Sequence, residues 1–123
     1  MIVLDSSVWV AFFDKDDSFH HRATQIVSSL QERIALPEYV LLEVTTVLSQ
    51  KAGKSLANVF LRKITTNQDV QVLSSSQQFL DAVIHLYLSK TNGKLSFVDY
   101  ALLYLSSKTR VVTFDKDLKK ELE

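Results

Sequence analysis

The run Ile2-Val3-Leu4-Asp5-Ser6-Ser7 opens the chain with aliphatic, partly β-branched residues, followed by an acid and two serines. A short apolar run that ends at turn-forming residues is typical of a buried strand. Either serine can cap a helix, and apolar residues that suit such a helix follow at Val8, Trp9, Phe12 and Phe13. The stretch therefore predicts a strand, an acidic turn and a helix.

Strands and helices alternate along the rest of the chain. Further short apolar runs predict strands at Ile34–Leu36, Val70–Leu73 and Arg110–Phe114. Helical patterns predict helices at 19–32, from Pro37 to near Gly53, at 55–64, through Phe79 and Tyr87 to near Asn92, at 96–105 and at 115–122. Because this alternation implies parallel βαβ units, we expect an α/β fold of three layers, α/β/α, around a central, mainly parallel sheet of about four or five strands.

Length and composition fit one globular domain, residues 1–123. Apolar residues make up 46% and charged residues 23%, which excludes a disordered or fibrous chain. The sequence has no cysteine, so disulfides, thiolate nucleophiles and cysteine-based metal sites are excluded. The longest apolar stretches are too short to cross a membrane, and the first residues lack the basic segment of a signal peptide. We therefore expect a cytoplasmic protein without a membrane segment.

The charge balance bears on nucleic-acid binding. The formal net charge is zero, because 14 Lys and Arg residues balance 14 Asp and Glu residues. Domains that bind nucleic acid stably usually carry a basic excess. Contact with RNA or DNA would then depend on a local basic patch, on a bound metal ion, or on both. The balance argues more strongly against a stable binding module than against an enzyme that touches its substrate briefly.

Three acids lie where helices are expected to start. Asp5 and Asp115 follow predicted strands, and Asp99 comes three residues after Ser96 at the beginning of a predicted helix. Asp is a good N-cap, and Ser96 with Asp99 has the spacing of a capping box. Taken singly, each acid could therefore be purely structural.

Glu43 has no such explanation. It lies in the middle of the apolar and β-branched helical stretch Tyr39–Leu48. A carboxylate buried there without a partner would be strongly destabilising, so its charge must reach water, a cation or a hydrogen-bond donor. The structural alternative is that Glu43 faces solvent on the exposed side of its helix.

The four acids make a stronger case together. In an open parallel sheet, ligands bind beyond the carboxyl ends of the strands, and Asp5 and Asp115 both follow such ends. Asp99 and Glu43 could reach the same rim from their helices. Clustered carboxylates repel one another, and a hard divalent cation such as Mg²⁺ or Mn²⁺ removes that cost. The sequence therefore predicts a metal-dependent site.

The segments around these acids resemble the four acidic motifs of the PIN-domain ribonucleases. They read Ile2-Val3-Leu4-Asp5-Ser6-Ser7, Glu43 within its helix, Leu95-Ser96-Phe97-Val98-Asp99 and Val112-Thr113-Phe114-Asp115. Each motif is short, but the ordered set spans nearly the whole chain. It is most similar to the compact VapC-type toxins of toxin–antitoxin pairs.

The resemblance implies a PIN fold and the endonucleolytic cleavage of RNA with Mg²⁺ or Mn²⁺. It implies that Asp5, Glu43, Asp99 and Asp115 hold the metal, and that Ser7 orients one of these ligands. In the toxin branch it further implies a cognate antitoxin that covers the site and a toxin that forms a homodimer.

Further charged residues lie near the expected rim. Asp117, two residues beyond Asp115, could be an additional ligand, although we favour an ordinary acid in the first turn of a helix. Lys15, Arg110 and Lys116 lie in segments close to the rim and could contact an RNA backbone, although solvated surface charge is the more common role.

Other functions fit the residues less well. A haloacid-dehalogenase-like phosphotransferase would need a second Asp where Ser7 stands, and a response-receiver domain would need an acidic pair near the first strand, where Asp5 is followed by Ser6. Two alternatives within the PIN resemblance stay open. One is a solitary RNA-processing nuclease, and the other is a non-catalytic module that binds protein or RNA.

Overall fold

The computed structural model describes residues 1–91 and 93–123, and its sheet has four strands. These are β1 (Ile2–Leu4), β2 (Ile34–Pro37), β3 (Val70–Leu73) and β4 (Arg110–Val112). The strands lie in the order β3-β2-β1-β4, and each neighbouring pair is parallel. The predicted parallel sheet is therefore confirmed, with four strands in the described part of the chain.

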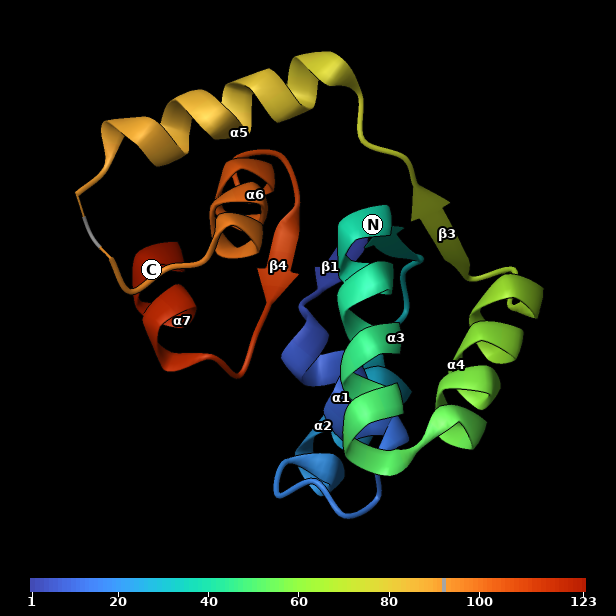
Figure 1. Ribbon diagram of the computed structural model, residues 1–123. Coiled ribbons are helices and arrows are strands. Elements are labelled where there is room, and N and C mark those ends of the chain that lie inside the picture. Colours follow the sequence, from blue (N-terminus) through green and yellow to red (C-terminus); the bar gives the residue numbers. More distant parts are fainter. Residues whose placement is uncertain (92) are drawn as a thin grey trace.

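Pairs of helices connect the strands (Figure 1). α1 (Ser6–Phe13) and α2 (His20–Ser29) join β1 to β2, while α3 (Glu38–Ala52) and α4 (Lys54–Thr66) join β2 to β3. α5 (Gln77–Ser89) and α6 (Phe97–Leu105) join β3 to β4, and α7 (Lys116–Leu122) follows β4. Each expected helix is present. α5 ends at Ser89, and the end expected near Asn92 falls on a position outside the described residues.

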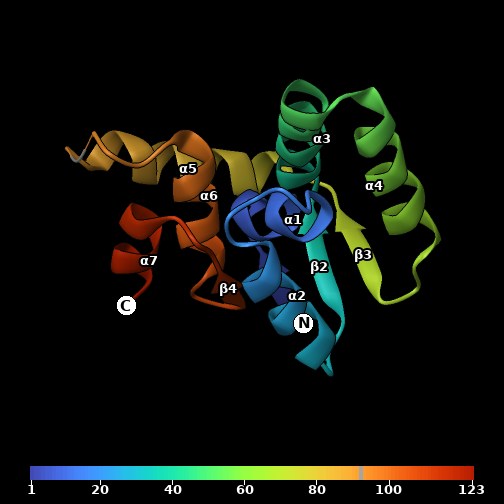
Figure 2. The ribbon, with the colours of Figure 1, turned by 90° about the horizontal axis from the view of Figure 1, so that it is seen from below.

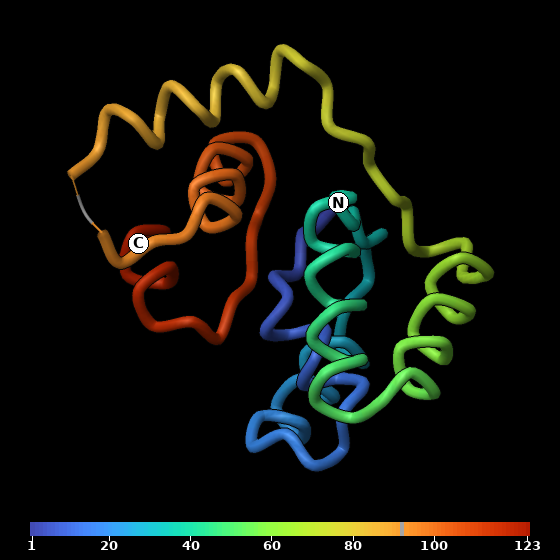
Figure 3. The backbone as a smooth tube through the Cα atoms, viewed as in Figure 1, coloured from blue at the N-terminus to red at the C-terminus, as the bar shows by residue number. Residues whose placement is uncertain are grey.

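The strand order creates a switch point between β1 and β4. Two connections step from β1 to β2 and on to β3, whereas the third returns across the sheet to the other side of β1. Figure 3 follows this return from β3 through α5 and α6 to β4. Because crossovers between parallel strands are right-handed, opposite steps place their helices on opposite faces. Figures 1 and 2 accordingly show α5 and α6 grouped apart from α1 to α4.

Gly53 ends α3 and allows the chain to turn into α4. Its φ of 100° lies in a region that side-chain-bearing residues rarely adopt. Its N–H donates to the carbonyl of Leu48 and to that of Ser49, which closes the last turn of α3. The buried residues of α3, Val40, Val44 and Leu48, face the core. Glu43, directly before Val44, lies half-buried at the margin of this face.

The core forms around β1 and α1. Ile2, Val3 and Leu4 are at most 1% exposed. Trp9 is also buried, and its ring meets the ring of Phe60 edge-on at 5.8 Å. Trp9 is therefore a core residue. Within the described residues, no helix is both long enough and apolar enough to cross a membrane.

Candidate active site

Asp5 lies at the switch point, directly after β1, and its side chain is held on both oxygens. Its backbone N–H donates to the Val112 carbonyl of β4 at 2.9 Å. Oδ1 accepts a hydrogen bond from the Ser6 N–H at 2.7 Å. Oδ2 accepts from the Thr113 hydroxyl at 2.7 Å and from the Ser7 hydroxyl at 3.1 Å. The residue is only 4% exposed, so this carboxylate has a fixed orientation.

The same two hydroxyl groups connect Asp5 to the loop between β4 and α7. Ser7 Oγ accepts a hydrogen bond from the Phe114 N–H at 3.0 Å, and Thr113 Oγ1 accepts one from the Asp115 N–H at 3.0 Å. The N–H groups of Phe114 and Asp115 therefore donate to side chains instead of to a neighbouring strand. They explain why β4 ends at Val112 rather than at Phe114, as the sequence had suggested.

Thr113 is a residue of this site that the sequence analysis missed. It is 7% exposed and joins the carboxylate that follows β1 to the backbone that follows β4. A threonine between a β-branched strand and an acid was visible in the sequence. Its role was not, because the role depends on the pairing of β4 with β1.

Asp99 and Asp115 both cap helices, which confirms the structural interpretation that the sequence offered for each of them. Asp99 Oδ2 accepts from the Ser96 N–H at 2.9 Å, and the Asp99 N–H donates to Ser96 Oγ at 3.1 Å, which completes the capping box. Asp115 Oδ1 accepts from the Leu118 N–H at 3.0 Å. Each cap uses one carboxylate oxygen, so the structural role does not occupy the whole acid.

Glu43 reaches the same place from α3. Burial raises the pKa of its carboxyl group, and the negative charges of Asp5 and Asp99 raise it further. A hydrogen bond from the Ser6 side chain acts in the opposite direction and lowers the pKa. The predicted alternative, in which Glu43 simply faces solvent, does not describe a half-buried carboxyl group that interacts with two other acids.

Asp99 shares this electrostatic environment. Burial raises its pKa, and the charges of Asp5 and Asp115 add to the increase, although the hydrogen bonds from Ser96 oppose it. Glu43 and Asp99 thus interact with Asp5, and Asp99 also interacts with Asp115. The structure brings all four predicted acids into one electrostatic cluster at the switch point.

The cluster offers a divalent cation only oxygen donors, and its like charges favour a cation. Among the residues that the structure describes, no three acidic or histidine side chains already have the geometry of a metal site. The caps give a physical reason, because Asp99 and Asp115 each turn an oxygen toward a backbone N–H. Asp5 is fixed in place, so Asp99, Asp115 and Glu43 are the side chains that would adjust around an ion. The residues fit a hard cation in charge and donor type.

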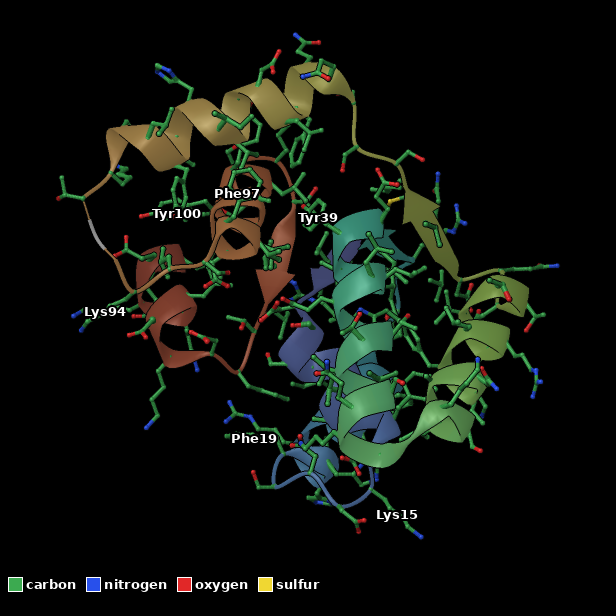
Figure 4. The ribbon with its side chains drawn as sticks, in the orientation of Figure 1. Lys15, Phe19, Tyr39, Lys94, Phe97 and Tyr100 are labelled. Atoms are coloured by element: carbon green, nitrogen blue, oxygen red, sulfur yellow. The ribbon has the colours of Figure 1, made fainter. Side chains whose placement is uncertain are left out.

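The other charged residues named from the sequence lie at different distances from the cluster. Asp117 is exposed in the first turn of α7 and does not contribute to the pKa shifts of Glu43 or Asp99. Lys116 directly follows Asp115, whereas Lys15 points away from the fold into solvent (Figure 4).

Arg110 is the first residue of β4, so it lies at the amino-terminal end of the strand, whereas the acid cluster lies beyond the carboxyl end. Its Nη2 lies 3.3 Å from Glu32 Oε1. The expectation that Arg110 lies near the rim is wrong.

Comparison with known proteins gives the same family as the motifs. The chain belongs to the PIN domain family, which it matches over residues 2–121. Nine solved chains match it, among them the crystal structure of VapC20 from Mycobacterium tuberculosis, a toxin that cleaves the sarcin–ricin loop. The TM-score to that structure is 0.88 at 20% identity, over 98% of this chain and 94% of the other. A search of curated protein sequences found no match.

Replacing Thr113 by Val should loosen the switch point. The substitution keeps the shape but removes the hydroxyl that donates to Asp5 and accepts from the Asp115 N–H. Hydrogen bonds to charged groups contribute about 1.5–3 kcal/mol, so we expect the free energy of unfolding in urea to fall by about that amount. Thr65→Val, on the exposed side of α4, is the matched control and should change it by less. Equal effects of the two substitutions would contradict the role of Thr113.

Replacing Glu43 by Gln should stabilise the metal-free protein at neutral pH. The folded protein raises the pKa of Glu43, so the ionised group destabilises the fold once the pH exceeds that raised pKa. Gln removes this charge and keeps an acceptor for Ser6. In thermal unfolding without divalent ions, the midpoint of Glu43→Gln should exceed that of wild type, and the difference should shrink as the pH falls toward the ordinary pKa of glutamate. A lower midpoint at neutral pH would show that the charge of Glu43 is not a cost.

Proposed function

We propose that the chain is a metal-dependent endoribonuclease that cleaves RNA phosphodiester bonds. The observation that carries the proposal is the electrostatic cluster of Asp5, Glu43, Asp99 and Asp115 at the switch point. Ligands of open parallel sheets bind at such points. Membership of the PIN domain family and the fold shared with a toxin that cleaves the sarcin–ricin loop support the same reaction.

In this proposal the four acids hold Mg²⁺ or Mn²⁺, and Ser7 and Thr113 hold Asp5 in place. A cation held there would lower the pKa of a water molecule and would stabilise negative charge on the phosphoryl oxygens. Asp5 provides the fixed anchor, because hydrogen bonds restrain both of its oxygens. Asp99 keeps Oδ2 on its cap and has Oδ1 for an ion. Glu43 and Asp115 complete the set or orient the attacking water.

We further propose that the protein is the toxin of a toxin–antitoxin pair, acts in the cytoplasm and forms a homodimer. Because the acid cluster is the proposed RNA-cleaving centre, an antitoxin that covers it would block cleavage. The apolar side chains of Ile84, Tyr87 and Leu88 on α5 are 43%, 44% and 76% exposed. Exposed apolar surface of this kind is typical of protein-binding faces, and it is available to the antitoxin or to a second copy.

The first test of the proposal is RNA cleavage by Asp99→Asn. Asn retains an oxygen that can accept the Ser96 N–H, so the cap and the fold should persist, while one negative ligand is lost. Even residues behind the ligands of a metal typically contribute about 10- to 100-fold to activity or affinity, so we expect a loss larger than this. Cleavage of total RNA is followed with Mg²⁺, with Mn²⁺ and with EDTA.

Asp117→Asn is the matched control, because it neutralises an exposed acid outside the cluster. It should cleave as wild type does. If Asp99→Asn and wild type cleave equally, or if neither metal supports cleavage of RNA by wild type, the nuclease proposal fails.

The antitoxin proposal predicts a short reading frame next to this gene. Its product, when co-expressed, should bind the chain and suppress the cleavage seen with Mg²⁺. Co-purification followed by the cleavage assay is the measurement. A gene without such a neighbour, coding for an active nuclease, would contradict the toxin role and favour a solitary RNA-processing enzyme.

A further inference from the structure

A cleft adjoins the acid cluster on the side of the α1–α2 connection. Its volume is about 240 Å³. Its lining combines polar residues of the candidate active site with apolar side chains. The polar residues that matter here are Ser6, Ser7 and Asp115, and the apolar ones are Phe19, Val47 and Phe114. The cleft therefore adjoins the proposed catalytic centre, because Asp115 lines it and because Ser6 and Ser7, which also line it, donate hydrogen bonds to Asp5.

Two of the apolar lining residues, Phe19 and Phe114, stack on each other. The rings of Phe19 and Phe114 lie 4.9 Å apart with an angle of 19° between their planes. Phe19 comes from the α1–α2 connection (Figure 4), and Phe114 comes from the loop that the Asp5 network fixes. Although Phe114 covers one face of Phe19, Phe19 is 43% exposed. An exposed aromatic ring held by a second ring is a preformed stacking surface.

The charged residues near the stacked pair can accept the negative charge of a nucleic-acid backbone, unlike the acid cluster. The guanidinium carbon of Arg22 lies 5.6 Å from the centre of the Phe114 ring, and Arg22 is exposed. Asp17 also lines the cleft, but Lys51 Nζ lies 3.0 Å from its carboxylate and compensates its charge. Lys116, which directly follows Asp115 in the chain, is also exposed. Arg22 is therefore a cation beside the stacked pair that phosphates can reach.

We propose that this cleft binds a base of single-stranded RNA, which stacks on Phe19 and places the adjoining phosphate at the acid cluster. Aromatic side chains beside basic groups are the usual way in which proteins hold unpaired bases. Stacking does not require a basic protein overall, which agrees with the zero net charge. Every base has a flat face, so the site selects single strands rather than a sequence. This inference rests on the proposed nuclease function for its biological meaning, but not for its binding test.

The test compares two probes of equal length and charge: a fluorescent oligoadenylate and a ribose-phosphate strand without bases. All proteins carry Asp99→Asn so that RNA stays intact, and binding is measured by fluorescence anisotropy. The parent should bind oligoadenylate more tightly than the abasic strand. Stacking contributes about 1–3 kcal/mol per base, so Phe19→Leu should weaken oligoadenylate binding by about 5-fold to 150-fold. Binding of the abasic strand should not change.

Two further variants complete the design. Phe19→Trp keeps an aromatic face and should bind oligoadenylate at least as tightly as the parent. Tyr104→Leu removes an aromatic side chain of similar exposure, 37%, from the end of α6 that lies away from Asp99, and should change neither affinity. Thermal unfolding of each variant verifies the fold. If Phe19→Leu does not fold, the indole fluorescence that Phe19→Trp gains over the parent carries the test, because oligoadenylate should quench it and the abasic strand should not.

The outcomes separate this inference from the nuclease proposal. The stacking site is overturned if the parent does not prefer oligoadenylate, if Phe19→Leu binds it as the parent does, or if both probes weaken equally. Cleavage is assayed separately with the wild-type acids. A base-dependent loss in Phe19→Leu without any cleavage by wild type would uphold the binding site and reject the nuclease.

Discussion

The Asp5 carboxylate is the constraint on which the rest of the site depends. It follows β1 at the switch point between β1 and β4. Its two oxygens restrain the start of α1 through the Ser6 N–H and restrain the β4–α7 loop through the hydroxyls of Ser7 and Thr113. One side chain therefore joins two strands, a helix start and a loop. Asp115 and Phe114 take their positions from this arrangement.

Much of the fold could be predicted from the sequence because its signals are local. Short β-branched runs such as Val70–Leu73 and capped apolar helices such as α6 satisfy their backbone groups within a few residues. Gly53 marked the end of α3 for the same reason. The strand order is different, because it depends on contacts between segments far apart in the chain. Arg110 was misplaced on this account, since the edge at which a strand begins follows from its pairing.

In the candidate site, too, the residues with local sequence signals could be predicted, and those that depend on contacts between distant segments could not. Asp5, Glu43, Asp99 and Asp115 could be named from their motifs, and the structure places them within one electrostatic cluster. Their helix-cap explanation was also correct for Asp5, Asp99 and Asp115, so capping and the proposed ligand role coexist. Thr113 and the Phe19–Phe114 stack were not predicted, because both depend on the β4–α7 loop meeting a distant segment. Local chemistry is readable from the sequence, whereas a partner across the sheet is not.

The central claim, that this acid cluster binds a divalent cation, is tested most directly by locating the ion. A crystal of the wild-type protein soaked in Mn²⁺ would be measured at a wavelength where manganese scatters anomalously. Our account predicts an anomalous peak in contact with Asp5 and at least one of Glu43, Asp99 and Asp115, and it predicts that Asp5→Asn loses the peak. A saturating soak that leaves the cluster without a peak, or places manganese only elsewhere, would contradict the account.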